Sequence, residues 1–119
     1  MSKLAEAIAK EEGFGISGAV PTRNLNPGDI EHAPGEMHNT SSPIGSFSTV
    51  EEGWAALERQ LQLFADRGLT VAEAIYTFAP PTENNSAAYL AYVISELPGC
   101  SSDTLVSDAL KIPGEYVNE

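Results

Sequence analysis

The sequence predicts a single, mainly helical domain with one small lobe that is loop-rich or carries short β-structure. Several segments place apolar residues at helical spacing and are closed by glycine or proline. Between residues 13 and 43 the composition changes to Gly, Pro, Asn, Ser and Thr, which is typical of turns and at most short strands. A chain of 119 residues, 42% of them hydrophobic, has room for one core. We therefore expect one domain over residues 1–119.

The N-terminal half is expected to contain a helix, the lobe and a short strand. The first helix is predicted over residues 2–12, because apolar residues recur at helical spacing and Gly13 then ends it. The lobe follows. Residues 44–50 favour a short strand that ends at Phe47.

The longest helix is predicted to begin after Thr49. Thr49 and Glu52 match a capping box, in which side chain and backbone exchange hydrogen bonds at the start of a helix. The helix is expected to end at Gly68. Its apolar positions, spaced by three or four residues, are Trp54, Leu57, Leu61 and Phe64. This stripe predicts burial, and core packing is the preferred role for Trp54.

Three shorter helices are expected in the C-terminal half. Thr70 and Glu73 form a second capping box, and the helix that they open is stopped before Pro80. A further helix is predicted over residues 86–97, before a Pro-Gly pair, and a last one over residues 104–111. The sequence shows no internal repeat and no linker.

The charge balance excludes some classes of partner. The chain has 17 acidic and 6 basic residues, a formal net charge of -11, so its field repels nucleic acid and anionic lipid. No apolar run approaches the roughly 20 residues that span a bilayer, and the N-terminus lacks the apolar segment of a secretory signal. Cys100 is the single cysteine and cannot form an internal disulfide. We expect a monomer that is made in the cytoplasm and does not insert into membranes.

Several short motifs occur in a fixed order along the chain. They are Glu12-Gly13-Phe14, residues 23–30, Gly45-Ser46-Phe47, residues 52–57, Ala74-Ile75-Tyr76, Ala79-Pro80-Pro81, Glu83-Asn84-Asn85 and Tyr89. In this order they resemble a family of lysozyme-like and lytic-transglycosylase-like proteins of bacteriophages and bacteria, whose members occur as endolysins and virion-associated wall-degrading proteins. The resemblance runs from about residue 4 to about residue 110.

The resemblance implies a lysozyme-like helical domain that degrades the bacterial cell wall. The expected activity is that of a peptidoglycan glycosidase, either a muramidase or a lytic transglycosylase, which needs no cofactor. Its substrate would be the glycan strand, reached after release from the cell or as part of a virion. The family's catalytic acid falls on Glu12. The family pattern carries Asn at the positions of Leu25 and Asp29, and the acidic pair Asp29 and Glu31 departs from it.

The chemistry of glycosidic cleavage also requires such an acid. A carboxyl group can protonate the leaving oxygen near neutral pH if desolvation raises its pKa. The end of a helix that packs on the core, beside Phe14 and the lobe, is a suitable place. Helical projection places both Glu11 and Glu12 near the buried face, and both could instead be solvated acids at a helix end. The choice of Glu12 comes from the resemblance.

A second carboxylate would be needed by a two-carboxylate hydrolase. Asp29, Glu31 and Glu36 are the candidates in the lobe, although Asp after Pro-Gly commonly serves a turn. A lytic transglycosylase needs one carboxyl group, because the sugar's own hydroxyl attacks. The sequence does not separate these two outcomes.

The expected substrate-binding residues are polar or aromatic side chains placed to contact a sugar. They are Asn24, Asn26, Asp29, Tyr76 and Asn84. Asn24 and Asn26 have an alternative role in holding their own turn, which is the more common use of Asn beside Pro-Gly. Asn85 is a candidate N-cap for the helix that follows it.

Two other kinds of site are weaker alternatives. His32 and His38, with Glu31 or Glu36, could ligate a metal, but their spacing matches no established zinc motif. Cys100 lacks the motif of a thiol nucleophile. We therefore expect no metal site.

Two non-enzymatic functions remain open at this stage. A module that keeps the fold without activity could bind the wall or build a virion, since fold and function separate readily. An acidic surface could also dock a basic partner, for which the net charge is the sole support.

Overall fold

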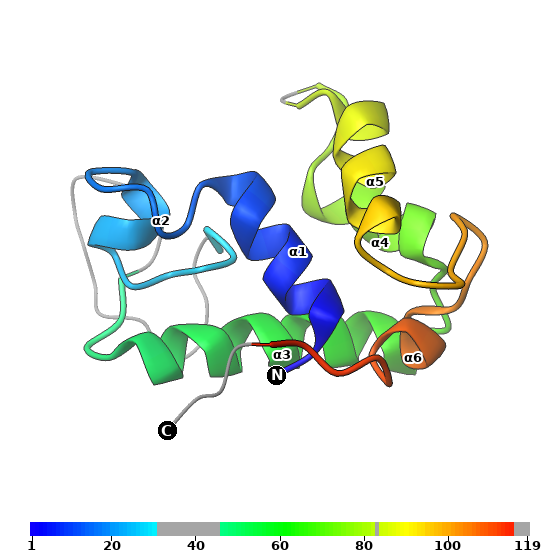
Figure 1. Ribbon diagram of the computed structural model, residues 1–119, viewed down its shortest axis with the longest axis horizontal. Helices are drawn as coiled ribbons and strands as arrows, with labels where there is room; N and C mark the ends of the chain where they lie inside the picture. The colour runs from blue at the N-terminus through cyan, green and yellow to red at the C-terminus, as the bar shows by residue number, and fades with distance from the viewer. Residues whose placement is uncertain (31–45, 83, 116–119) are drawn as a thin grey trace.

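A long helix, α3 (Val50–Asp66), lies along one side of the molecule, and the other helices pack against it or against one another (Figure 1). Its start has one half of the expected capping box, since the Thr49 hydroxyl accepts a hydrogen bond from the backbone N–H of Glu52 at 3.2 Å, while the Glu52 side chain bonds to hydroxyl groups and not to the backbone of Thr49. The Glu52 carboxylate accepts from the hydroxyls of Ser48 at 2.6 Å and Thr49 at 3.1 Å. The helix end is closed at Gly68, whose φ of +74° suits glycine.

The computed structural model describes residues 1–30, 46–82 and 84–115, and over these residues the chain is mainly helical, as predicted. Besides α3, the elements are α1 (Lys3–Glu12), α2 (Val20–Arg23), α4 (Val71–Phe78), α5 (Ser86–Ser95) and α6 (Val106–Ala109). No helix among these residues is long and apolar enough to cross a bilayer.

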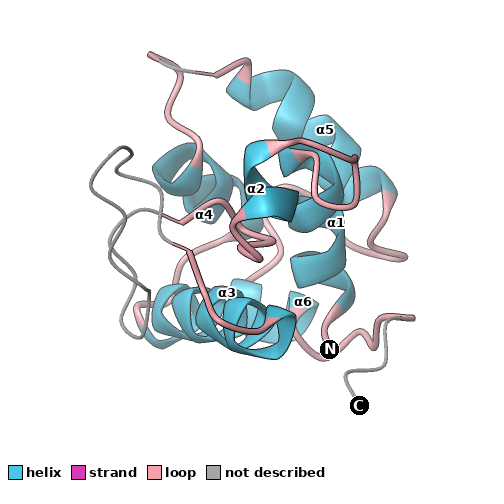
Figure 2. Ribbon diagram, turned by 90° about the vertical axis from the view of Figure 1, so that its left-hand side faces the viewer, coloured by secondary structure: helices cyan, strands magenta, loops and turns pink. Residues whose placement is uncertain are grey.

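The core lies where α1, α3, α4 and α5 meet. Helix α1 runs across α3, and α5 packs on the far side of α1 beside α4 (Figures 1 and 2). The side chains that are almost completely buried include Leu4, Ile8, Leu57, Leu61, Ile75, Val93 and Val106. Trp54 is buried with them, as its place on the apolar stripe predicted. Burial of this apolar stripe drives the helices together.

Local signals predicted the helix starts better than the helix ends. The Thr70–Glu73 capping box of α4 is present in full, and Asn85 caps α5 through its side chain. By contrast, α5 ends at Ser95 instead of residue 97. The last helix is one turn, Val106–Ala109, and its start is tied to the residues that open α4, since Val71 N–H donates to the Thr104 carbonyl and Val106 N–H donates to the Leu69 carbonyl.

The lobe differs from expectation in its described part. It contains the short helix α2, begun by Pro21 in its first turn, which the turn-rich composition concealed. The predicted short strand ending at Phe47 lies partly outside the described residues. In its described part Ser46 makes an isolated β-bridge, residues 47–49 contain no strand, and α3 begins at Val50. The backbone N–H of Phe47 donates to the carbonyl of Asn24 at 2.9 Å, which ties the segment before α3 to the end of α2.

Candidate active site

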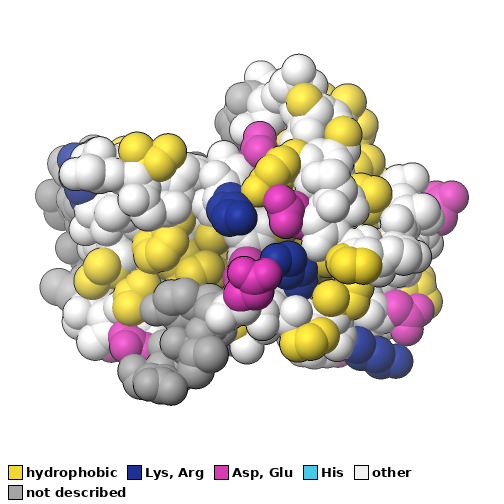
Figure 3. Space-filling model, in the orientation of Figure 1, with side chains coloured by type: hydrophobic (Ala, Val, Ile, Leu, Met, Phe, Trp, Pro, Cys, Tyr) yellow, Lys and Arg dark blue, Asp and Glu magenta, His cyan; other side chains and the backbone are white. Residues whose placement is uncertain are grey.

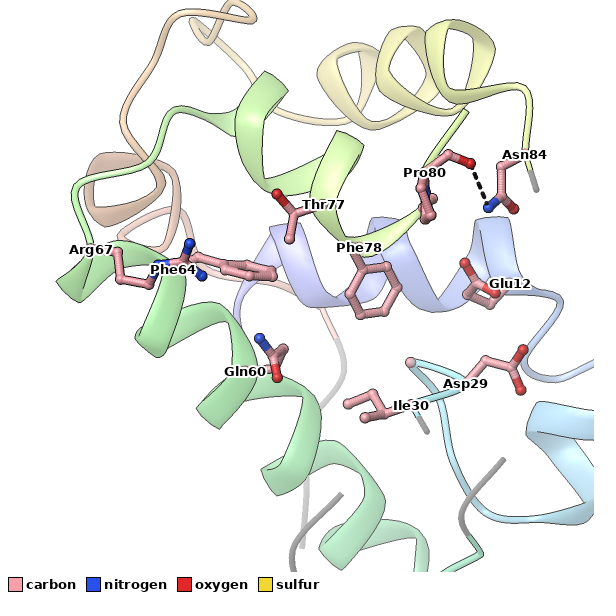
Figure 4. A pocket seen from close by; sticks show the side chains of 12 residues that line it. Glu12, Asp29, Ile30, Gln60, Phe64, Arg67, Thr77, Phe78, Pro80 and Asn84 are labelled. Carbon is pink, nitrogen blue, oxygen red and sulfur yellow. Dashed lines mark hydrogen bonds between the residues drawn. The ribbon is translucent and has the colours of Figure 1, made fainter. Parts of the chain in front are cut away.

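A cavity of about 500 Å³ lies between the C-terminal end of α1, the lobe, α3 and the segment after α4 (Figure 4). It is lined by Glu12, Gly28, Asp29, Ile30, Gln60, Phe64, Arg67, Thr77, Phe78, Ala79, Pro80 and Asn84. Its size falls in the range of cavities that bind small molecules or short polymer segments, and its walls combine apolar surface with a few polar groups.

Glu12 is held at one end of this cavity by the way α1 stops. Gly13 adopts a left-handed backbone with φ +92°, and its N–H bonds back to the carbonyls of Ala9 and Lys10. The turn then directs Phe14 onto α3, where its ring meets Trp54 edge-on, with 5.4 Å between ring centroids and 74° between planes. The last helical residue, Glu12, therefore has a defined position at the cavity wall.

The environment of Glu12 keeps its carboxyl group protonated to higher pH than usual. Burial raises its pKa above the ordinary value of 4.5, and the negative charges of Asp29 and Glu11 raise the pKa further. One contact acts in the other direction: the Tyr89 hydroxyl donates a hydrogen bond to Glu12 Oε2 at 2.7 Å, which lowers the pKa. Desolvation is the largest influence, so the net direction is upward.

The lobe presents Asp29 to the same end of the cavity through a short, internally bonded loop. Asn26 accepts a hydrogen bond from the backbone N–H of Ile30 at 3.1 Å and donates to the Ile30 carbonyl at 2.9 Å. The N–H of Asp29 also bonds to the carbonyl of Asn26 at 2.9 Å. These bonds fix residues 26–30 as one unit.

Two glycines let this loop lie directly on α3. A Cβ added at Gly53 would overlap the carbonyl oxygen of Leu25, and one added at Gly28 would come within 2.8 Å of a methyl group of Leu57. Glycine is therefore required by space at Gly53, where the obstacle is backbone, whereas at Gly28 the Leu57 side chain would have to shift. The close approach sets how far Asp29 extends from α3 toward α1.

Leu25 and Asp29 share an uncommon backbone. Both have φ of +52°, and they are the non-glycine residues with positive φ in the described part of the chain. Asn tolerates this left-handed conformation better than Leu.

The structure brings together three of the six site residues expected from the sequence. Glu12, Asp29 and Asn84 line the cavity, and Asn84 is positioned by bonds from its N–H and its amide to the Pro80 carbonyl. Glu11, the competing acid, is exposed and does not line the cavity.

The other three expected residues do not line the cavity. Asn26 is 0% exposed and both ends of its amide bond to the Ile30 backbone, so the expectation of substrate contact is corrected in favour of the turn-holding role. Asn24 ends α2, and its carbonyl anchors Phe47. Tyr76 is 41% exposed on the outer side of α4.

Several cavity residues were not singled out from the sequence. Gln60 and Arg67 come from α3 and its end, while Thr77 and Phe78 come from the last turn of α4. Their sequence signals were weak. Gly68 and Pro80 predict where the two helices end, but they do not predict that the residues before them line a cavity. Tyr89 was noted as the last residue of the motif series and not as a site residue, because its bond to Glu12 joins residues 77 positions apart.

No metal centre is found among the described residues, since no group of three or more potential ligands gathers there. The alternative metal ligands Glu31, His32, Glu36 and His38 lie outside the described residues, as does the candidate second carboxylate Glu31.

A second hollow, of about 350 Å³, opens between α1 and α3. Its apolar floor includes Phe14 and Trp54. Lysines and acids adjoin one another on this face (Figure 3), and Lys3 pairs with Glu96 at 4.0 Å and with Glu115 at 3.7 Å. These ion pairs account for the charged side chains of Lys3, Glu96 and Glu115 at its rim.

The comparisons with known proteins identify no relative. No family model, no curated protein and no solved structure matches the chain.

Proposed function

We propose that this chain is a lysozyme-like glycosidase that cleaves the glycan strand of peptidoglycan with Glu12 as general acid. The observation that carries the proposal is a desolvated carboxyl group at a helix end, facing a cavity, with its pKa raised by burial. A glycosidase needs a carboxylic acid that stays protonated near its working pH. A carboxylate with only a structural role has no need of this placement.

The cavity supports a division of labour between its two carboxyl groups. Glu12 would give its proton to the glycosidic oxygen as the bond from the sugar's anomeric carbon to that oxygen breaks. Asp29, on the facing loop, would stabilise the positive charge that develops on the sugar. Water or the sugar's own hydroxyl then attacks the anomeric carbon, and these two nucleophiles define a muramidase or a lytic transglycosylase.

The architecture also supports the lysozyme-like assignment. A first helix ends in the acid, a loop lobe faces it, and the remaining helices build the opposite wall. The positive φ at both positions where the family pattern has Asn is a further point of agreement. We propose that the protein acts at the bacterial cell wall, as an endolysin or a virion component of a bacteriophage, and works without a cofactor.

Digestion of purified peptidoglycan tests this function. The wild type, Glu12→Gln and Glu11→Gln are compared, and the released fragments are identified by mass spectrometry. Glu11→Gln is the matched control, because it removes a neighbouring carboxylate that lies outside the cavity. We expect Glu12→Gln to lose at least about 100-fold in rate, as removal of a general acid typically does, and Glu11→Gln to retain activity.

The ends of the fragments identify the reaction. Reducing ends indicate a hydrolase, and anhydro ends indicate a transglycosylase. Absence of release from several wall types, or equal rates for wild type and Glu12→Gln, would overturn the proposal. The chain would then be better explained as an inactive lysozyme-like module that binds the wall or builds a virion.

A further inference from the structure

The charges around the cavity are divided between its two ends. Glu12 and Asp29 lie at one end, and Arg67 lies at the other, beside Phe64 (Figure 4). Of the residues found to line the cavity, Arg67 is the one that carries a positive charge. In a chain with a net charge of -11, a cation on a cavity wall is a specific local feature.

Arg67 has a fixed backbone position and a side chain that the described ion pairs do not use. It closes α3, with its N–H bonded to the Leu63 carbonyl at 3.1 Å, and Gly68 then turns the chain away. The ion pairs found in the described residues engage Lys3 and Lys111. Figure 4 shows the Arg67 side chain extending from the end of α3 toward the Phe64 ring.

A guanidinium group in this place suits a carboxylate ligand. Its planar fork matches the two oxygens of a carboxylate, and it loses less on partial desolvation than an ammonium group does. Arg67 itself is exposed at this end of the cavity, next to the buried Phe64, so its guanidinium group is accessible to a ligand.

We propose that Arg67 binds a carboxylate substituent of the glycan strand and makes the protein prefer carboxylate-bearing strands over neutral ones. The inference rests on the proposed function and names a specificity determinant for it. A carboxylate near Asp29 would meet a like charge, whereas one at the opposite end meets Arg67. The strand is thereby bound in one direction, with its substituent away from the acid that cleaves.

The test measures binding with Glu12→Gln, so that the result does not depend on cleavage. Three soluble probes share one glycan backbone. Strands freed of peptide carry lactyl carboxylates, the same strands after amidation carry none, and strands with intact peptides carry carboxylates on the peptide only. Affinity is measured by calorimetry at about 0.15 M salt, where long-range charge effects are largely screened.

We expect Glu12→Gln to bind at least one carboxylate-bearing probe about 10-fold more tightly than the amidated strands, a factor that corresponds to about 1.4 kcal/mol. Adding Arg67→Gln should abolish this preference, and Arg67→Lys should keep part of it. Arg59→Gln is the matched control, because it removes the same charge from the exposed side of α3, away from the cavity. The probe that carries the preference identifies a lactyl or a peptide carboxylate.

If Arg67 had only a structural role at the helix end, Arg67→Gln would lower the thermal stability and leave the preference for carboxylate-bearing strands unchanged. Retained preference in Arg67→Gln, no preference in the Glu12→Gln parent, or no binding of any probe overturns the inference. If Arg67→Gln does not fold, an unaltered preference in Arg67→Lys overturns it instead. Cleavage without a preference refutes this inference alone, and a preference without cleavage refutes the proposed function alone.

Discussion

The Tyr89 hydroxyl donates a hydrogen bond of 2.7 Å to Glu12 across 77 positions of sequence. This contact joins α5 to the last residue of α1. Burial and the nearby Glu12 charge raise the pKa of Tyr89, so its hydroxyl stays a neutral donor throughout the working range. The hydrogen bond from Tyr89 favours the charged form of Glu12 and so lowers the pKa of Glu12, against the larger effect of desolvation, which raises it.

Tyr89→Phe is therefore expected to raise the pKa of Glu12. A general acid acts while it is protonated, so the alkaline limb of the activity profile should move to higher pH. The measurement is kcat/KM against pH for both proteins, and carbon NMR titration of the Glu12 carboxyl provides a readout independent of activity. A limb and a titration that stay in place, or move to lower pH, would contradict the assigned role of Tyr89.

Glu12 should cost the protein stability at neutral pH. Because its pKa is raised in the folded state, its contribution is fully present below about pH 4.5 and is lost as the pH rises through the folded-state pKa. Glu12→Gln should therefore melt at a higher temperature than the wild type near pH 7, and the difference should shrink toward pH 4. Glu51→Gln is the control, because it removes an exposed carboxylate on α3 that does not act on the pKa of Glu12. A difference independent of pH would show that Glu12 is not desolvated.

Gly53→Ala should be destabilising, although glycine to alanine inside a helix normally stabilises by about 1 kcal/mol. The added Cβ would overlap the Leu25 carbonyl oxygen, and relief requires the lobe to move off α3. We expect a loss of about 1–3 kcal/mol in the free energy of unfolding, measured by urea denaturation. A matched substitution at an exposed site of α3, Ala55→Gly, should cost only about 1 kcal/mol. An increase in stability for Gly53→Ala would place the loop farther from the helix.

The starts of helices were predictable because their signals are local. Thr70 and Glu73 lie three residues apart and need nothing else to form the capping box. The same holds for Glu12, whose place at a helix end follows from the glycine after it. We expected the Glu12 carboxyl group to be desolvated because its helix packs on the core. In the structure, burial does raise the pKa of Glu12.

The far wall of the cavity was not predictable in the same way. Arg67 follows the end of α3 and Thr77 lies in α4, and only the folded arrangement of the helices makes both line one cavity. Asn26 was ambiguous for another reason: the amide that could bind a sugar is the same group that holds a turn. Burial decided between these roles, and burial is a property of the folded chain.

Asn26→Ala tests that decision. The substitution leaves the N–H and the carbonyl of Ile30 without the two bonds that the amide now makes, in a largely enclosed loop. We expect a loss of about 1–3 kcal/mol in the free energy of unfolding. Asn24→Ala removes a side chain with no such clamp and should change stability by less than about 0.5 kcal/mol. A stable Asn26→Ala protein with weakened substrate binding would reverse the assignment.

The dependence of KM on ionic strength distinguishes the long-range repulsion by the whole chain from the short-range attraction by Arg67. A net charge of -11 repels an anionic glycan strand over the Debye length, about 30 Å at 0.01 M salt and about 10 Å at 0.1 M. Added salt in this range should therefore lower KM for carboxylate-bearing strands, because it screens the long-range repulsion more than the short contact with Arg67. For amidated strands KM should hardly change. If KM for the carboxylate-bearing strands rises steadily with salt instead, local attraction outweighs the repulsion, and the acidic surface does not control the approach of substrate.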